Sequence, residues 1–194
     1  MLKKIRSLAS NSDFIEVYDN VLTQQECDRL IYLFEKSKKV PGLFTEDGVQ
    51  TLDFNVKKGC EIEDAKFSKG DSISNCIKPF LLSCIDKYST KYSGLGYLSS
   101  WKYDDAYTFK KFESEDDGFK EWHTEHGPFS ISNRILAWMF YLNDAKSGTE
   151  FMHYSTVCAK MGRCIIWPAS WSHIHRSAPN KGLKYIISGW ISYQ

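Results

Sequence analysis

The sequence predicts an α+β protein in which two helices precede a double-stranded β-helix, or jelly roll. In the first half, two segments repeat their apolar residues at helical spacing. From about residue 103, the chain changes to short runs of aromatic and branched residues separated by Gly, Asn, Asp and Pro. Helices followed by antiparallel strands indicate this class. With 194 residues, the chain is expected to form one domain over 1–194.

The first helix is expected to begin after Thr23, which forms a capping-box pattern with Glu26. The apolar positions that follow at helical spacing are Cys27, Leu30, Ile31 and Phe34. The second helix is expected over residues 72–90, where apolar residues recur in the same way. Each helix should therefore present one apolar face to the core.

The strands are expected where aromatic and branched residues gather, at 106–112, 134–142, 149–157, 163–167 and 184–193. The segment 45–72 carries glycines and charges without a regular apolar period, so it is expected to be either a lid over an active site or a short strand pair with a solvated connection. The acidic residues at 113–117 are expected to form a solvated turn. Trp138 and Trp190 lie in expected strands and are interpreted as core residues.

Composition restricts the partners and the compartment. The chain has 25 basic and 24 acidic residues and a net charge of +1, so nothing in its overall charge indicates a nucleic-acid surface. No apolar stretch approaches the roughly 20 residues that span a membrane. The six cysteines form no C-x-x-C pair and no signal peptide is visible, which favours reduced thiols and a cytoplasmic protein.

The strongest functional signal is His123-Thr124-Glu125 together with His175. Alternate residues of an extended segment point to the same side, so His123 and Glu125 can face one ion while a distant strand supplies a third ligand. Two imidazoles and one carboxylate on one face of a metal form the facial triad of non-heme Fe(II) oxygenases. His175 is a suitable candidate for the third ligand, and His173, which has the same parity, is the alternative.

The other histidines are weaker candidates. His126 is out of phase with the pair, so it is interpreted as a loop residue, with a role beside the site as the alternative. His153 is expected to be a strand residue without a chemical role. Arg134 is expected to form an ion pair that holds the sheet, with a substrate contact as the alternative.

Residues 164–179 and 182–191 resemble the C-terminal half of the prolyl 4-hydroxylase-like 2-oxoglutarate/Fe(II) dioxygenases. In that family a distal histidine is followed by a proline and then by a basic residue that binds the cosubstrate, and Pro179 and Lys184 stand at these offsets from His175. The resemblance extends to 139–144 and to 17–22, whereas residues from about 40 to 70 are unmatched. It supports the expected jelly roll, buttressed by the N-terminal helices.

The resemblance implies a function and its residues. His123, Glu125 and His175 would bind Fe(II) and form the catalytic centre, while Lys184 and Tyr141 would bind the distal carboxylate of 2-oxoglutarate. The implied reaction uses O2 and hydroxylates a C–H bond with release of succinate and CO2, and ascorbate is the expected reductant. The expected substrate is a prolyl residue of a peptide or protein, with small molecules as a second class.

Two features depart from the family. Its carboxylate ligand is usually Asp, whereas position 125 is Glu, and its Gly-rich turn is shortened here to Ser147-Gly148-Thr149. The first departure leaves open a non-catalytic module that binds the metal or 2-oxoglutarate. A zinc hydrolase is a further alternative, because two His and one Glu also describe catalytic zinc. Lys184 argues against it, since a buried cation has no evident role in activating water.

Overall fold

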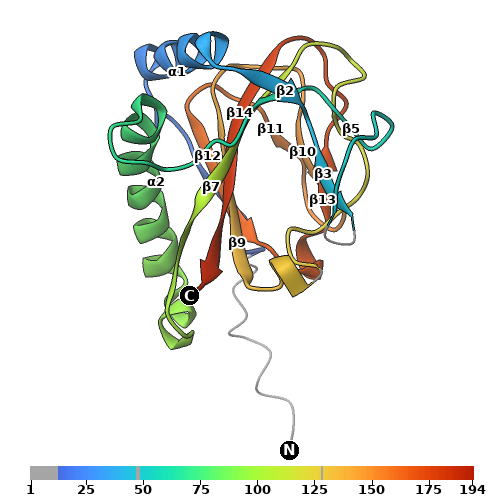
Figure 1. Cartoon of the computed structure of the whole chain (residues 1–194). Helices are drawn as coiled ribbons and strands as arrows, with labels where there is room; N and C mark the ends of the chain where they lie inside the picture. The colour runs from blue at the N-terminus through green and yellow to red at the C-terminus, as the bar shows by residue number, and fades with distance from the viewer. Residues whose placement is uncertain (1–12, 47–48, 128) are drawn as a thin grey trace, which may run out of the picture.

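The computed structural model describes residues 13–46, 49–127 and 129–194. Two helices, α1 (Gln24–Lys36) and α2 (Ser72–Lys91), cover one face of a large antiparallel sheet, and a smaller sheet lies on the opposite side (Figure 1). The order of the large sheet is β1 (Glu16–Tyr18), β12 (Arg163–Pro168), β9 (Arg134–Tyr141), β14 (Lys184–Tyr193), β7 (Trp101–Phe112), β6 (Cys60–Ile62) and β2 (Lys39–Pro41). The predicted α+β class is therefore confirmed.

The smaller sheet closes the other side of the jelly roll. It has the order β11 (Val157–Cys158), β10 (Gly148–Phe151) and β13 (His175–Ser177). Two further strand pairs complete this side, β3 (Phe44–Glu46) with β4 (Val49–Thr51) and β5 (Lys57–Lys58) with β8 (Gly118–Phe119). Short 3-10 helices lie at Ser93–Tyr97, Phe129–Ile131 and Trp171–His173.

The capping box predicted for the first helix is present. The Glu26 carboxylate accepts a hydrogen bond from the Thr23 backbone N–H at 2.7 Å, and Thr23 Oγ1 accepts one from the Glu26 N–H at 3.3 Å. The second helix begins after Asp71, whose carboxylate accepts from the Ser74 N–H at 2.7 Å. Each cap satisfies an N–H that the helix itself leaves without a partner.

Strand alternation divides the core into two parts. Along β14, Tyr185, Ile187 and Ile191 pack against the helices, whereas Ile186 and Trp190 face the space between the two sheets. Neighbouring β9 and β7 divide their side chains in the same way because the side-chain period of a strand is two. One face of the large sheet therefore forms the main hydrophobic core, and the other face is available for a site.

The strand predictions hold in most places and fail in one. Four predicted segments correspond to β7, β9, β12 and β14, although β7 begins earlier, at Trp101; the strand expected at 149–157 ends at Phe151, and a turn separates it from β11. The segment 45–72 contains short strands and the start of α2, so the strand-pair alternative is confirmed for β3 and β4. Within the described residues, no helix combines the length and apolar content needed to cross a membrane.

Gly148 sits where two backbones approach closely. A Cβ atom at this position would lie 2.0 Å from the Val157 carbonyl oxygen, to which a side chain cannot adjust. We expect Gly148→Ala to lower the free energy of unfolding by about 1–3 kcal/mol, because overpacking must separate β10 from β11.

Urea unfolding monitored by circular dichroism measures this loss. Gly94→Ala is the matched control, since no atom lies within 4 Å of a Cβ built there, and it should change stability by less than about 0.5 kcal/mol. Equal stability of the two variants would contradict the close contact.

Candidate metal centre

Two segments fifty residues apart meet at the candidate metal centre. His123 and His175 form an isolated antiparallel bridge, in which the His123 N–H donates to the His175 carbonyl at 3.0 Å and the His175 N–H donates back at 2.9 Å. The Glu125 N–H donates to the Ala169 carbonyl at 3.2 Å. Backbone pairing therefore positions all three predicted ligands before any side chain contributes.

The three side chains converge on one point. Their potential ligand atoms all lie within 4.8 Å of one another. His175 Nε2 is 3.3 Å from Glu125 Oε1, and His123 Nε2 is 3.9 Å from the same oxygen. This spacing allows one ion to contact all three, since bonds from a metal to nitrogen and oxygen are roughly 2 Å long.

Backbone carbonyls fix which ring nitrogen faces the carboxylate. His123 Nδ1 lies 2.9 Å from the Glu121 carbonyl, and His175 Nδ1 lies 3.0 Å from the His173 carbonyl. Each Nδ1 therefore carries the proton and donates it, which leaves the lone pair of each Nε2 directed at the centre. This is the tautomer that coordination through Nε2 requires.

The electrostatics of the centre also suit a cation. Burial, followed by the neighbouring His175, lowers the pKa of His123 to about 3, so this imidazole is neutral near pH 7. Burial alone would raise the pKa of Glu125, but the neighbouring His175, His123 and Arg134 hold it below its ordinary value. The centre therefore offers a neutral imidazole and an ionised carboxylate to a divalent ion.

The second oxygen of Glu125 is held from the opposite side. The indole N–H of Trp190 donates to Glu125 Oε2 at 2.7 Å, and Arg134 Nη1 lies 3.7 Å from that oxygen. The Arg134 guanidinium also stacks 3.6 Å above the centre of the Trp190 ring. Arg134 was predicted to form an ion pair that holds the sheet; it does form an ion pair, but its partner is Glu125 of the candidate metal centre.

Trp190 was predicted to be a core residue, whereas the structure places it at the cavity wall in contact with Glu125. The signal that could have found it is strand parity. Trp190 lies three strand repeats after Lys184, so the two belong to the same face of β14.

His173 does not contribute to the centre. Its Nε2 lies 2.7 Å from the Asp13 carbonyl and its Nδ1 lies 2.9 Å from the Ser172 hydroxyl, so both ring nitrogens already have partners. The ring stands in the short helix before β13, whereas His175 opens the strand. Of the two alternatives, the structure brings His175 to the other ligands.

His126 and His153 lie outside the cluster. His126 is exposed in the loop after Glu125, with Nδ1 3.1 Å from the Arg134 carbonyl, as the loop interpretation predicted. His153 was expected on a strand, but it lies in the turn after β10, because this strand ends two residues earlier.

Lys184 and Tyr141, the predicted cosubstrate ligands, are both about 1 % exposed. Lys184 Nζ donates to the Ser147 hydroxyl at 2.7 Å and lies 5.0 Å above the Phe112 ring, and burial lowers its pKa to about 8. Among the described residues it has no carboxylate within ion-pair distance. Such a buried cation is costly unless an anion joins it.

Tyr141 shares a 2.6 Å hydrogen bond with the Thr149 hydroxyl, and this bond also holds the side chain of the shortened turn. Neither Tyr141 nor Lys184 lines the cavity, whereas their contacts Thr149 and Phe112 do. The two residues therefore stand directly behind the cavity wall.

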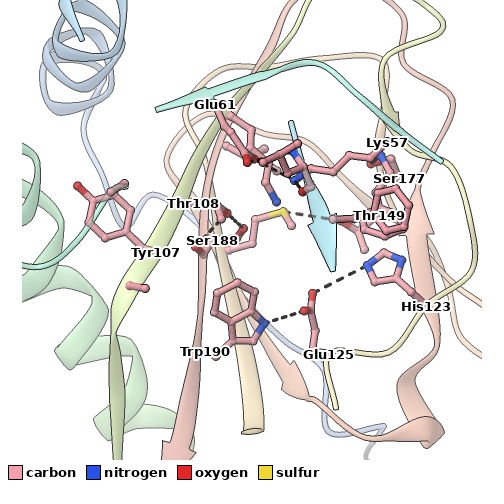
Figure 2. Close-up of a pocket in the computed structure, with 18 of the residues that line it drawn as sticks. Lys57, Glu61, Tyr107, Thr108, His123, Glu125, Thr149, Ser177, Ser188 and Trp190 are labelled. Atoms are coloured by element: carbon pink, nitrogen blue, oxygen red, sulfur yellow. Dashed lines mark hydrogen bonds and ion pairs between the residues drawn. The ribbon is translucent and has the colours of Figure 1, made fainter. Parts of the chain in front are cut away.

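The cavity itself has a volume of about 430 Å³ and opens between the two sheets (Figure 2). The metal-centre residues form one part of its wall, with Trp190 and Glu125 joined by a hydrogen bond in the close-up. Leu43 and Phe44 line the cavity as well. They belong to residues 40–70, which have no counterpart in the family that the sequence resembles. This segment therefore contributes to the walls of the site.

The C-terminal part of the chain is similar to a known protein family. Residues 107–192 match the model of the 2OG-Fe(II) oxygenase superfamily. The segment contains all five predicted site residues, so the predicted resemblance is confirmed at this level. A comparison with curated protein sequences gave no match.

Solved structures with the same fold include three oxygenase-type enzymes. A prolyl hydroxylase from Trichoplax adhaerens, in complex with a hypoxia inducible factor oxygen degradation domain peptide fragment, aligns with a TM-score of 0.69 at 14 % identity over 94 % of this chain and 84 % of its own. The viral collagen prolyl hydroxylase from Paramecium Bursaria Chlorella virus-1 aligns with a TM-score of 0.60 at 14 % identity, covering 93 % and 97 %.

The third is the non-heme α-ketoglutarate-dependent epimerase SnoN from nogalamycin biosynthesis, with a TM-score of 0.64 at 15 % identity over 93 % of this chain and 78 % of its own. At these identities the likeness shows a shared fold, and it confirms the predicted double-stranded β-helix. Hydroxylases and an epimerase share that fold, so the fold alone does not select the reaction.

The contact between Trp190 and Glu125 generates a test. We expect Trp190→Phe to weaken metal binding by about 10-fold, because partners that orient a ligand typically contribute 10–100-fold in affinity. Anaerobic titration with Co(II), followed by its visible absorption, measures the change. Trp101→Phe also removes an indole hydrogen bond, from Trp101 Nε1 to the Leu95 carbonyl, but outside the site. Equal affinities in the two variants would show that Trp190 does not position Glu125.

Proposed function

We propose that the chain is an Fe(II)- and 2-oxoglutarate-dependent dioxygenase that hydroxylates a C–H bond, with a prolyl residue of a peptide or protein as the leading substrate. One observation carries the proposal: His123, Glu125 and His175 direct two Nε2 atoms and one carboxylate oxygen to a common point at the wall of the cavity. Ligands gathered on one side leave the other side of an ion open to the cavity, as the chemistry of these oxygenases requires.

The three candidate ligands fit the metal that the superfamily implies, and two buried residues behind the cavity wall offer partners for the cosubstrate. His123, Glu125 and His175 would hold Fe(II), for which a mixed nitrogen and oxygen set is suitable. Lys184 would pair with the distal carboxylate of 2-oxoglutarate, and Tyr141 would donate its hydroxyl to the same group. An arriving carboxylate would replace Ser147 as the main partner of Lys184 and remove the cost of an unpaired buried cation.

The bound metal and cosubstrate would supply the oxidising chemistry, in which O2 and 2-oxoglutarate give succinate, CO2 and a hydroxylated product. The side chains supply position and charge. Trp190 and Arg134 hold one oxygen of Glu125 and leave the other for the metal. Phe119 stacks on the His123 ring, with the ring centroids 3.8 Å apart, and covers that face of the imidazole. Ascorbate is proposed as the external reductant that keeps the iron ferrous.

The prolyl substrate rests on the structural neighbours. One of them is a prolyl hydroxylase in complex with a peptide fragment, and another is a collagen prolyl hydroxylase. Because an epimerase shares the fold, small molecules remain the second substrate class. The superfamily match favours iron over the zinc hydrolase considered from the sequence.

Succinate formation tests the proposal. Protein supplied anaerobically with Fe(II), ascorbate and 2-oxoglutarate should form succinate when O2 is admitted, even slowly without the prime substrate. His175→Ala should abolish the signal because it removes a metal ligand. Lys184→Met should raise the KM for 2-oxoglutarate at least about 10-fold, since a charge-assisted bond contributes 1.5–3 kcal/mol.

Lys181→Met, at an exposed lysine of the preceding loop, is the control and should match the wild type. Binding of 2-oxoglutarate without succinate in the wild-type protein would instead support the non-catalytic module, for which Glu125 in place of the usual Asp is the motivating feature.

The pKa of Lys184 predicts a pH dependence. Burial lowers this pKa to about 8, so the ammonium form dominates below pH 8 and the neutral amine above it. A carboxylate pairs only with the ammonium form. The affinity for 2-oxoglutarate should therefore fall above pH 8, by up to about 10-fold per pH unit. Calorimetric titration of the Mn(II)-loaded protein from pH 6.5 to 9 measures it. The same slope in Lys184→Met would exclude Lys184 as its origin.

A further inference from the structure

We propose that the substrate carries an anionic group, a carboxylate or a phosphate, that binds in the cavity beside Lys110 and Lys57. The inference rests on the proposed function, since it concerns the substrate of the same cavity. It narrows the substrate class to compounds or peptides with an anionic group near the reacting carbon. An internal prolyl residue has no charge of its own, so a neighbouring group would have to supply it. Lys110 and Lys57 have no part in the metal centre or the proposed cosubstrate site.

The first observation is a buried ion pair in the cavity wall. Lys57 lines the cavity, is only 5 % exposed, and pairs with Glu61 at 2.9 Å. Figure 2 shows Lys57 and Glu61 on the side of the cavity opposite Trp190 and Glu125. Lys57 also donates to the Leu43 carbonyl, so its side chain is fixed in place. A positive charge is thus held on the far side of the cavity from the carboxylate of the metal centre.

The second observation is that Lys110 has no acidic partner. It lies on β7 between Thr108 and Phe112, and all three side chains line the cavity. Glu61 stands directly opposite Lys110 on β6, where an opposite charge would ordinarily pair with it.

The Glu61 carboxylate is already occupied. One of its oxygens accepts from Lys57 and the other accepts from the Leu43 N–H at 3.3 Å. Among the described residues, no carboxylate lies within ion-pair distance of Lys110. Lys110 therefore lacks an acidic partner, because the Glu61 carboxylate opposite it pairs with Lys57.

The cavity as a whole carries excess positive charge. Its charged lining residues are Lys57, Lys66, Lys110, Arg134, Arg176, Glu61, Asp64 and Glu125. Three of these cations are paired: Lys57 with Glu61, Arg134 with Glu125, and Arg176 with Glu150 at 2.8 Å. The remaining lining charges are Lys110 and the exposed Lys66 and Asp64, so Lys110 is the cation left without a balancing anion. An uncompensated charge in a cleft attracts ligands of the opposite sign.

Lys57 and Lys110 carry like charges and repel each other. Burial, followed by the charge of Lys110, lowers the pKa of Lys57 to about 8. Like charges in a partly buried site raise the free energy of the charged state, and an anion placed between them would lower it. The two positive charges therefore favour binding of a small anionic ligand between them.

The cosubstrate does not account for this cluster. The proposed cation for 2-oxoglutarate is Lys184, which pairs across the strands with Phe112, whereas Lys110 pairs with Ile186 one inward-facing position along. Lys184 stands behind the wall, and Lys110 forms part of it. Because Lys184 is the proposed cation for the cosubstrate, Lys110 remains available to bind the substrate.

Phosphate binding tests the site without requiring turnover. Titration with inorganic phosphate at fixed ionic strength, followed by calorimetry, should give a weak affinity that Lys110→Gln lowers at least about 10-fold and Lys110→Arg restores. Lys102→Gln, at an exposed lysine of the same strand, should bind like the wild type. Unchanged binding in Lys110→Gln would overturn the proposal. Since Lys110 makes no ion pair, its variants should keep the wild-type Tm.

Matched compounds test the substrate class. Consumption of 2-oxoglutarate should be stimulated at least about 10-fold more by L-proline than by L-prolinamide, or by Ac-Pro-Glu-NH2 than by Ac-Pro-Gln-NH2. The two pairs distinguish a free carboxylate from an acidic peptide side chain, and Lys110→Gln should remove the preference in either case. Equal stimulation within both pairs would overturn the proposal.

The affinity for 2-oxoglutarate separates this inference from the proposed function. It should change less than about 2-fold in Lys110→Gln, whereas a 10-fold loss would assign the cluster to the cosubstrate and overturn the proposal. Phosphate binding that depends on Lys110 in a protein that forms no succinate would sustain the anion site and reject the dioxygenase.

Discussion

The reciprocal backbone hydrogen bonds between His123 and His175 are the constraint on which the site depends. They join a loop that follows β8 to the first residue of β13, and so they bring residues 52 positions apart to one point. A backbone bridge fixes the Cα positions, while carbonyls fix the ring orientation through Nδ1. The centre is therefore formed by the fold itself, and a metal would enter a preorganised set of ligands rather than gather them.

The large sheet supplies the rest through strand alternation. Each of its central strands directs one set of side chains to the helices and the other to the cavity, so the apolar core and the polar site share the same backbone. A shift of β14 by one residue would bury Tyr185 where Lys184 now stands and expose Ile187 to the cavity. The capped helices protect this register, because their apolar faces pack only against the correct face of the sheet.

Local patterns in the sequence predicted much of this arrangement, and tertiary contacts decided the remainder. The capping box at Thr23 and the spacing of His123 and Glu125 are local, so both could be read directly. The early end of β10 at Phe151 depends on the turn that follows it, which displaced His153 from the predicted strand. Strand parity places Trp190 on the cavity face, but its contact with Glu125 and the pairing of Lys57 with Glu61 depend on how the chain folds around the cavity, which periodicity does not specify.

The glutamate at position 125 illustrates how tertiary contacts compensate for a local departure. Its side chain has one more methylene than aspartate, and this adds a rotatable bond whose freedom would blur the ligand position. The Trp190 indole and the Arg134 guanidinium remove that freedom by holding Oε2, while Oε1 stays directed at both imidazoles. Because Arg134 also stacks on Trp190, the two restraints support each other. The longer side chain is thus held by partners on the neighbouring strands, so glutamate at this position is compatible with the proposed metal centre.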